Sequence, residues 1–172
     1  WNEIAAIFSR QEHLSAGDTV RLFAILNYTL CDAGIAAWDA KYHYRFWRPV
    51  HAIHRADEDG NPETSPEPYW EPRLVSPPHP EYVSGHSAFS GAGAAVLSWF
   101  FGDRPIAFRV GSSSLPGVEF YYADLQSCAS EIAVSRLYGG IHFSFSNRDG
   151  LVMGKQIAAW VTSRAYPPAP AR

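Results

Sequence analysis

One stretch sets the organisation of the chain: Pro80-Glu81-Tyr82-Val83-Ser84-Gly85-His86, followed by fifteen mostly small or apolar residues, SAFSGAGAAVLSWFF. Serine is a preferred N-cap and glycine a common helix end, so a helix is predicted from Ser84 to near Gly102. The first turn of a helix presents unpaired N–H groups and the positive end of the macrodipole, which suit an anion. Gly85 lets an anion approach the backbone, and His86 can exchange a proton near neutral pH. The alternative is an ordinary cap beside a surface histidine.

The composition is that of a globular chain. Its 172 residues are 47% hydrophobic and 18% charged, enough for one domain with a buried core. A net charge of -3 and the lack of a Lys/Arg run argue against a nucleic-acid partner. No zinc pattern is present, and Cys31 and Cys128 are expected to be buried free thiols in helices. Because the residues after Trp1 already read as helix interior, we expect residues 1–172 to be a single helical domain and the C-terminal part of a longer protein.

Helical periodicity covers the first third of the chain. Residues 2–13 form a short amphipathic helix, and Ser15 with Asp18 resembles a capping box that opens a long helix over about 16–46. An apolar stripe recurs every three or four residues along this helix and is expected to face the core. Its members are Val20, Phe23, Asn27, Leu30, Gly34, Trp38 and Lys41. A lysine on such a stripe either extends its ammonium to solvent or is buried with an anionic partner.

A long proline-rich loop separates this region from the helix after Ser84. Pro49 restarts or kinks the helix for a turn or two. Residues 57–80 then contain seven prolines. A loop of this length inside a domain is usually functional or disordered. Its aromatic residues, Tyr69 and Trp70, favour an ordered wall around a pocket.

The last third of the chain returns to helices. A short strand or extended segment is expected at 106–112, and Asp124 is expected to cap the next helix. Ser146 or Asn147 is expected to cap a final helix. The sequence therefore predicts a mostly helical bundle.

Two apolar stretches, 22–38 and 87–101, are candidates for a membrane span. The first contains Asn27 and Asp32, and the second is shorter than the roughly 20 residues that a bilayer needs. No transmembrane segment is predicted.

Three segments carry reactive side chains at defined spacing. Lys41 precedes the pair Arg48-Pro49 with six residues between them, Ser84-Gly85-His86 follows, and Ser135-Arg136 precedes His142 with five residues between them. In this order and spacing, the segments resemble the motifs of the phosphatidic acid phosphatase type 2 and vanadium-dependent haloperoxidase superfamily. The resemblance covers most of the chain. It implies an all-α catalytic domain, a helical bundle of the vanadium haloperoxidase and acid phosphatase type.

The chemistry of these side chains agrees with the resemblance. A tetrahedral or trigonal-bipyramidal oxyanion needs hydrogen-bond donors from several directions, and a helix end and cationic side chains supply them. The candidate donors are Lys41, Arg48, Ser84, Gly85 and Arg136. The alternative for each arginine is a surface ion pair, which for Arg136 would involve Glu131 or Asp149.

The resemblance also implies individual roles. His142 would bind the central atom, as the axial ligand of vanadium or as the nucleophile that forms a phosphohistidine. His86 would act as general acid and base on the opposite side, and Lys41 would polarise a bound peroxide. Trp38 and His79 match positions beside the halide in the haloperoxidase branch. Their alternative is an interior tryptophan and a loop histidine.

The implied activity is that of a vanadium-dependent haloperoxidase, which oxidises halide with hydrogen peroxide at a histidine-bound vanadate and passes the halogen to a small organic acceptor. An extracellular or periplasmic location is implied as well. Because phosphate matches vanadate in charge and shape, a phosphomonoesterase acting on a phosphoester is the alternative. A third possibility is an inactive helical fragment or an oligomerisation module, with exposed apolar surface covered in a homo-oligomer.

One position departs from the family pattern. The family often has Asp four residues after the second histidine, where the carboxylate orients the ring. Here that position is Ser146, and Asp149 lies three residues further on. We expect Ser146 or Asp149 to substitute. The departure weakens the phosphatase interpretation more than vanadate binding, because the phosphatase needs a strong histidine nucleophile.

Overall fold

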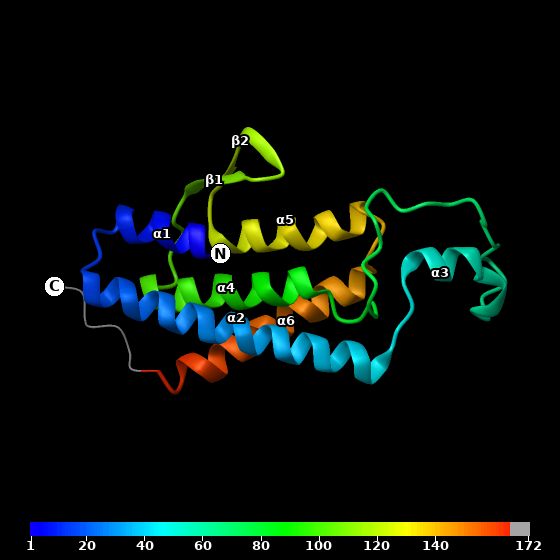
Figure 1. The fold of residues 1–172 in the computed structure, drawn as a ribbon, viewed down its shortest axis with the longest axis horizontal. Helices are drawn as coiled ribbons and strands as arrows, with labels where there is room; N and C mark the ends of the chain where they lie inside the picture. The colour runs from blue at the N-terminus through cyan, green and yellow to red at the C-terminus, as the bar shows by residue number, and fades with distance from the viewer. Residues whose placement is uncertain (166–172) are drawn as a thin grey trace.

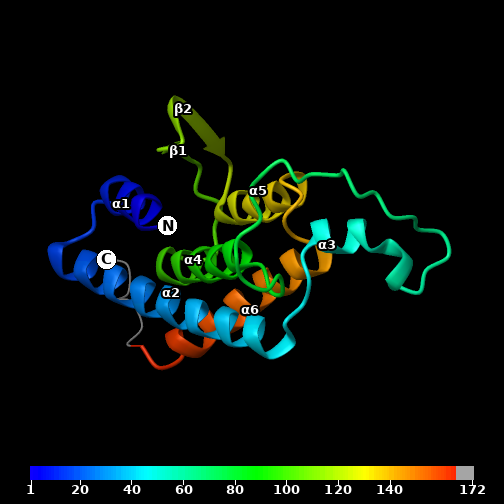
Figure 2. The same cartoon turned by 45° about the vertical axis from the view of Figure 1, so that its right-hand side comes forward.

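The small-residue helix that follows Ser84 lies at the centre of the structure, a computed structural model that describes residues 1–165. The elements are α1 (Asn2–Gln11), α2 (Ala16–Tyr44), α3 (Pro49–His54), the 3-10 turn η1 (Ala56–Glu58), α4 (Gly85–Phe101), β1 (Phe108–Ser112), β2 (Leu115–Tyr122), α5 (Leu125–Tyr138) and α6 (Ser144–Thr162). Helices α2, α5 and α6 pack around α4 (Figures 1 and 2). The predicted helical bundle is confirmed.

Side-chain caps begin three of the helices where the sequence predicts them. In each, an oxygen of the residue before the helix accepts an N–H group that has no partner inside the first turn. The oxygens of Ser15, Ser84 and Asp124 accept the N–H groups of Asp18, Ser87 and Ser127 at 3.1, 3.4 and 2.6 Å. These starts depend only on neighbouring residues, which is why the sequence predicts them.

Helix α6 begins earlier than predicted. Its N-cap is Phe143, which makes no side-chain capping bond, and Ser146 and Asn147 lie inside the first turn. The expectation that one of these polar residues caps α6 is wrong. Both are instead buried, where α6 faces the start of α4.

The core side of α2 is not the stripe that the periodicity predicts. Val20 is 71% exposed and Trp38 40%, and Asn27 is exposed as well. The buried residues of α2 are Leu22, Ile25, Leu26, Thr29, Ala33, Ala37, Ala40 and Lys41. Apolar residues occur on both sides of this helix, so periodicity alone does not decide which side faces α4. Packing selects the side that is rich in alanine, because α2 lies close against α4 and α6 there.

Glycines bring the backbones of α4 and α6 into direct contact. A Cβ atom on Gly150 would lie 2.7 Å from the Ser84 carbonyl oxygen. On Gly154 it would overlap the Ala88 carbonyl oxygen and lie 2.5 Å from the Ala92 nitrogen. Since real Cβ atoms do not approach this closely, α6 can lie against α4 only where its side chains are absent. This packing places the start of α6 beside the start of α4.

An aromatic cluster closes the end of the bundle far from these helix starts. Phe8 is fully buried, and its ring meets the rings of Phe101 and Phe108 edge-on at 5.4 Å. Cys128 is a buried free thiol in the same core, as predicted, whereas Cys31 is free but exposed on α2. The expectation that Cys31 is buried is wrong because it lies on the outward side of the helix.

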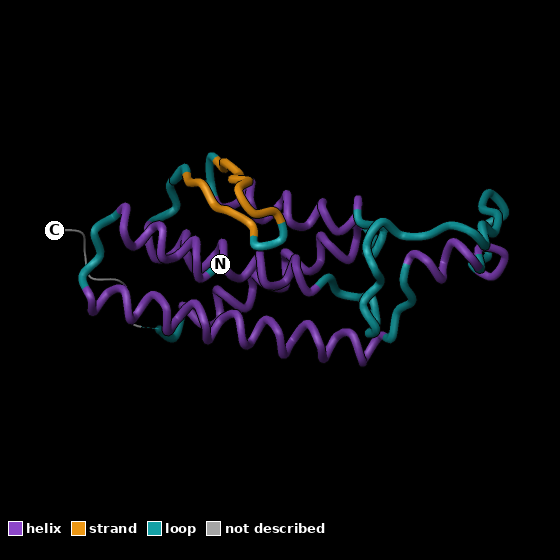
Figure 3. The backbone as a smooth tube through the Cα atoms, turned by 45° about the horizontal axis from the view of Figure 1, so that its top comes forward, coloured by secondary structure: helices purple, strands orange, loops and turns teal. Residues whose placement is uncertain are grey.

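The sequence predicts only one of the two strands of the β-hairpin. The short strand expected at 106–112 corresponds to β1, which pairs antiparallel with β2 from Phe108 opposite Tyr122 onward (Figure 3). Strand β2 is not predicted, because nearly all of its side chains are exposed and show no alternation of buried and exposed positions. Phe108 and Tyr122 are buried and attach the hairpin to the helices.

The proline-rich segment after η1 contains no helix or strand as far as α4. Backbone hydrogen bonds hold it at intervals: the Leu74 N–H donates to the Gly139 carbonyl, and the Glu81 N–H donates to the Phe46 carbonyl, both at 3.0 Å. Pro49 begins α3, as predicted. The segment therefore runs from α3 past the end of α5 and back to α2.

One described helical run, Ala16–His54, is long and apolar enough by length and composition alone to cross a membrane. A buried core helix meets the same criterion, and 33% of the most apolar window of this run is buried inside the bundle. The absence of a transmembrane segment stays a prediction.

Candidate active site

Four helix ends meet at one end of the bundle. The C-terminal ends of α2 and α5 and the N-terminal ends of α4 and α6 lie together there, beside the proline-rich segment (Figure 1). The three motif segments of the sequence are attached to these ends. The packing of two helices that end here against two that begin here brings together residues far apart in the sequence, such as Arg48 and His142, which lie 94 positions apart.

His142 is held on both sides of its ring. Its Nδ1 lies 2.6 Å from Glu81 Oε1, and its Nε2 lies 3.3 Å from Arg48 Nη1. Because a guanidinium can only donate, Nε2 accepts and the ring proton is on Nδ1, where it donates to Glu81. Burial lowers the pKa of His142 below its ordinary value, although Glu81 opposes this shift. The result is a neutral imidazole with its Nε2 lone pair directed toward the arginine.

The carboxylate hydrogen-bonded to His142 Nδ1 is that of Glu81, a residue that none of the three sequence motifs contains. The expectation that Ser146 or Asp149 takes this part is wrong. Asp149 accepts hydrogen bonds from Tyr82 at 3.1 Å and from Arg148 at 2.9 Å. Glu81 lies next to the Ser-Gly-His motif in the sequence, but its 61-residue separation from His142 gives no local signal of the contact.

Lys41 is fully buried, and its ammonium donates to three backbone carbonyls. The acceptors are those of Pro80, Glu81 and Val83, at 3.0, 2.9 and 2.6 Å. Burial, together with the charge of Arg48, lowers the pKa of Lys41 to about 8, against the opposite influence of Glu81. All three N–H donors are used, so Lys41 holds the chain before α4 in place. Donation to an anion requires one of these bonds to be exchanged.

Arg48 is also buried and binds the same chain segment. It donates from Nε and Nη2 to the His79 carbonyl at 3.2 and 3.1 Å, and from Nη1 to the Ile141 carbonyl at 2.7 Å. Burial lowers the pKa of Arg48, while Glu81 raises it. The guanidinium stays charged because the ordinary arginine pKa is far above neutrality.

The start of α4 presents the second histidine. Ser84 Oγ accepts from the Ser87 N–H at 3.4 Å and lies 3.0 Å from Ser87 Oγ, whose single proton is shared between Ser84 and Asn147 Oδ1 at 3.2 Å. His86 Nε2 lies 3.3 Å from Arg136 Nη1. Partial desolvation of the ring, followed by the positive charge of Arg136, lowers the pKa of His86 to about 4. His86 is therefore a neutral base at pH 7.

Arg136 does not form the surface ion pair considered as its alternative. Glu131 accepts from the Tyr122 hydroxyl at 3.0 Å, and Asp149 binds Tyr82 and Arg148. The Arg136 Nε donates to Ser135 Oγ at 3.2 Å. Its guanidinium faces the histidine at the start of α4, within the candidate site.

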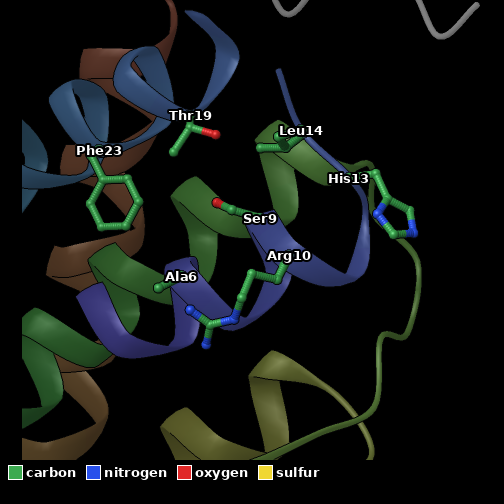
Figure 4. Close-up of a pocket in the computed structure, with 7 residues that line it drawn as sticks. All are labelled: Ala6, Ser9, Arg10, His13, Leu14, Thr19 and Phe23. Atoms are coloured by element: carbon green, nitrogen blue, oxygen red, sulfur yellow. The ribbon is translucent and has the colours of Figure 1, made fainter. Parts of the chain in front are cut away.

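A pocket of about 380 Å³ opens beside His86 and His142, and the predicted donors Lys41, Arg48, Ser84 and Arg136 are not among the residues that line it. The predicted site residues that line it are Trp38, His79, Gly85, His86 and His142. The Trp38 and His79 rings lie 5.2 Å apart at their centroids, so the pair expected beside a halide is at the pocket wall. A second hollow of about 430 Å³, between α1 and the start of α2 (Figure 4), is lined by other residues, among them Arg10 and His13.

The charges of the site suit an oxyanion. Within the described chain, the buried charged side chains other than histidine are Lys41, Arg48 and Glu81, and Arg136 adds a third, partly buried cation. One carboxylate, already bonded to His142, therefore interacts with the charges of Lys41 and Arg48, while Arg136 lies against His86 at the start of α4. No cluster of three or more His, Cys, Asp or Glu side chains that could hold a metal cation occurs in residues 1–165. The donor set fits a tetrahedral anion such as vanadate or phosphate.

This fold and this arrangement of residues define the helical-bundle domain of the vanadium haloperoxidase superfamily. Residues 21–167 match the family described as the VCPO second helical-bundle domain, and the chain belongs to that family. The three motifs predicted membership of the vanadium haloperoxidase superfamily, and this prediction is confirmed.

Individual relatives are haloperoxidases of different halide types. The chain is 31% identical over 116 residues to vanadium chloroperoxidase of Curvularia inaequalis, a match that covers 59% of this chain and 18% of that protein. It is 30% identical over 113 residues to vanadium-dependent bromoperoxidase of Corallina officinalis, covering 58% and 19%. The structure of a bacterial vanadium-dependent iodoperoxidase matches with a TM-score of 0.83 and 30% identity, over 96% of this chain and 38% of that one. The chain thus spans less than half the length of each.

Proposed function

We propose that the chain carries the vanadate site of a vanadium-dependent haloperoxidase and oxidises halide with hydrogen peroxide. The observation that carries the proposal is His142, neutral and with its Nε2 lone pair free of a proton, 3.3 Å from the Arg48 guanidinium. A bound vanadate would supply Lewis-acid activation of peroxide without a change of oxidation state. His142 Nε2 would be its ligand, and donors of Arg48, Ser84, Gly85 and Arg136 would hold its oxygens.

The remaining residues act on peroxide and halide. His86 is unprotonated at neutral pH, and its Nε2, to which Arg136 donates at 3.3 Å, would accept the proton of hydrogen peroxide once that hydrogen bond is exchanged. Lys41 would polarise the peroxide if one of its three carbonyl hydrogen bonds were exchanged. Trp38 and His79 receive the halide at the pocket wall.

A phosphomonoesterase is the second candidate function. The missing carboxylate four residues after His142 weakened this interpretation, but Glu81 now supplies a carboxylate to Nδ1. A histidine oriented in this way can attack a phosphoester with Nε2 and form a phosphohistidine. Phosphate also matches the charge of the donor set.

Parallel assays separate these functions. We expect peroxide-dependent halogenation of a phenol dye, tested with chloride, bromide and iodide, only after addition of orthovanadate. His142→Ala should abolish it, whereas His51→Ala, an exposed histidine on α3, should not change it. Hydrolysis of p-nitrophenyl phosphate without halogenation would support the phosphatase. Neither activity, with no binding of orthovanadate or phosphate, would identify an inactive helical module.

A further inference from the structure

We propose that Glu81 is the positioning residue of His142 and supplies, from the loop before α4, the carboxylate that the family pattern places four residues after the histidine. The inference deepens the proposed function and rests on it. It assigns to one glutamate the orientation of the ring that would hold vanadate. No metal-binding or catalytic contact of Glu81 itself is involved.

The Glu81 side chain makes two contacts that fix the ring and the backbone next to it. Its Oε1 accepts from His142 Nδ1 at 2.6 Å and from the Phe143 N–H at 3.1 Å. Glu81 is fully buried, and His142 is only 3% exposed. One oxygen thus orients the imidazole and also satisfies the N–H of the residue that begins α6. A ligand histidine whose other nitrogen donates to a carboxylate is fixed in tautomer and direction.

The backbone of Glu81 is anchored to the first motif segment. Its N–H donates to the Phe46 carbonyl at 3.0 Å, and its carbonyl accepts from Lys41 Nζ at 2.9 Å. A buried carboxylate is costly unless it is paired and hydrogen-bonded. Here Oε1 is hydrogen-bonded and the charges of Lys41 and Arg48 act on the carboxylate, while Oε2 has no hydrogen-bond partner in the described structure. Glu81 therefore links the three motif segments. It lies three residues before Ser84, its backbone bonds to Lys41 and Phe46 in the first segment, and its carboxylate bonds to His142 in the third.

Position 146 has no carboxylate to compete with Glu81. Ser146 is fully buried in the first turn of α6, and its Oγ has no hydrogen-bond partner in the described structure. A serine at that position cannot supply negative charge to the ring. The carboxylate on His142 Nδ1 comes from a loop 61 residues before the histidine and not from the helix that follows it.

The tautomer of His142 tests the inference directly. In intact protein labelled with ¹⁵N-histidine and free of vanadate, long-range ¹H–¹⁵N correlation spectra distinguish Nδ1–H from Nε2–H rings. The signals of His142 are assigned by their loss in His142→Gln. We expect the Nδ1–H form in the native protein and in Glu81→Gln, whose amide oxygen can still accept. Glu81→Leu, which has no acceptor, should give a mixture of both forms.

Orthovanadate binding, measured by equilibrium dialysis, is the second readout. We expect the affinity to fall about 10- to 100-fold in Glu81→Gln, the range found when the outer partner of a ligand histidine is removed. Asp149→Asn, which removes a carboxylate bound to Tyr82 and Arg148, is the matched control and should keep native affinity. Circular dichroism shows whether each variant is folded. If Glu81→Leu does not fold, the orthovanadate affinity of Glu81→Gln tests the inference.

Two results would overturn the inference: a predominantly Nε2–H ring in the native protein, or orthovanadate affinities of the Glu81 variants within twofold of native. Failure of the proposed function has a different signature. Native protein that binds no orthovanadate contradicts that function, while the tautomer measurement, made without vanadate, still decides the part played by Glu81.

Discussion

His86 shows how the surroundings of a single residue set its protonation. The groups facing it are the guanidinium of Arg136 at 3.3 Å and, further away, His142 and Lys41. Partial desolvation and these charges lower its pKa to about 4, so the folded protein disfavours the charged ring. The same cations that suit an anion therefore keep this histidine available as a base.

This shift predicts how stability depends on pH. Between the folded pKa of about 4 and the ordinary value near 6.5, the unfolded chain binds the extra proton. The contribution of His86 to stability is therefore fully present above about pH 6.5 and is lost as the pH falls toward 4. We expect the urea midpoint to drop less between pH 7 and pH 5 in His86→Gln than in the native protein. Equal drops would contradict the lowered pKa, and His51→Gln serves as the exposed control.

At the scale of the elements, the contact between α4 and α6 positions the site. Both helices begin at the pocket, and Gly150 and Gly154 of α6 lie against the backbone of α4. Helices that approach this closely leave no room for a methyl group. The start of α6, and with it His142, is therefore placed relative to His86 by glycines about two and three turns of helix away.

Gly154→Ala tests this packing. In an ordinary helix, alanine in place of glycine stabilises by up to about 1 kcal/mol. Here the new Cβ would overlap the Ala88 carbonyl oxygen, so we expect a loss of about 1–3 kcal/mol in the free energy of unfolding, measured with urea. Gly17→Ala is the control, because its Cβ would meet only Ser15 Oγ at 3.8 Å, and we expect no loss. A stabilised Gly154→Ala would mean that the two helices lie further apart.

At the scale of the whole molecule, α2 is apolar on two sides. One side packs into the bundle, and the other leaves Val20, Tyr28 and Ile35 between 65% and 71% exposed. A groove along this side, formed with Phe89, continues toward Trp38 at the pocket. Contiguous apolar surface of this kind is typical of surfaces that are covered by other protein.

Two substitutions on α2 distinguish its sides. Leu26 is fully buried, so Leu26→Ala should cost about 2–5 kcal/mol of unfolding free energy. Ile35 is 65% exposed, so Ile35→Ala should change it by less than about 0.5 kcal/mol. Urea unfolding of the two variants measures both. A loss above about 1 kcal/mol in Ile35→Ala would contradict the exposed position and indicate that this side is covered in solution.

The sequence by itself determined what depends on neighbouring residues. Ser15, Ser84 and Asp124 cap helices through bonds to the N–H group three residues later, so the starts of α2, α4 and α5 are predictable. The three motif segments are recognisable for the same reason, because each spacing lies within one short segment. Their order was enough to predict the bundle and the family.

Tertiary structure alone decided which residues meet across the bundle. The carboxylate on His142 comes from Glu81 rather than from Ser146 or Asp149, and the buried side of α2 is the alanine-rich one. Strand β2, whose side chains are mostly exposed, also has no signal of its own in the sequence. Such contacts depend on how closely whole helices and loops pack, and local spacing carries no information about that distance.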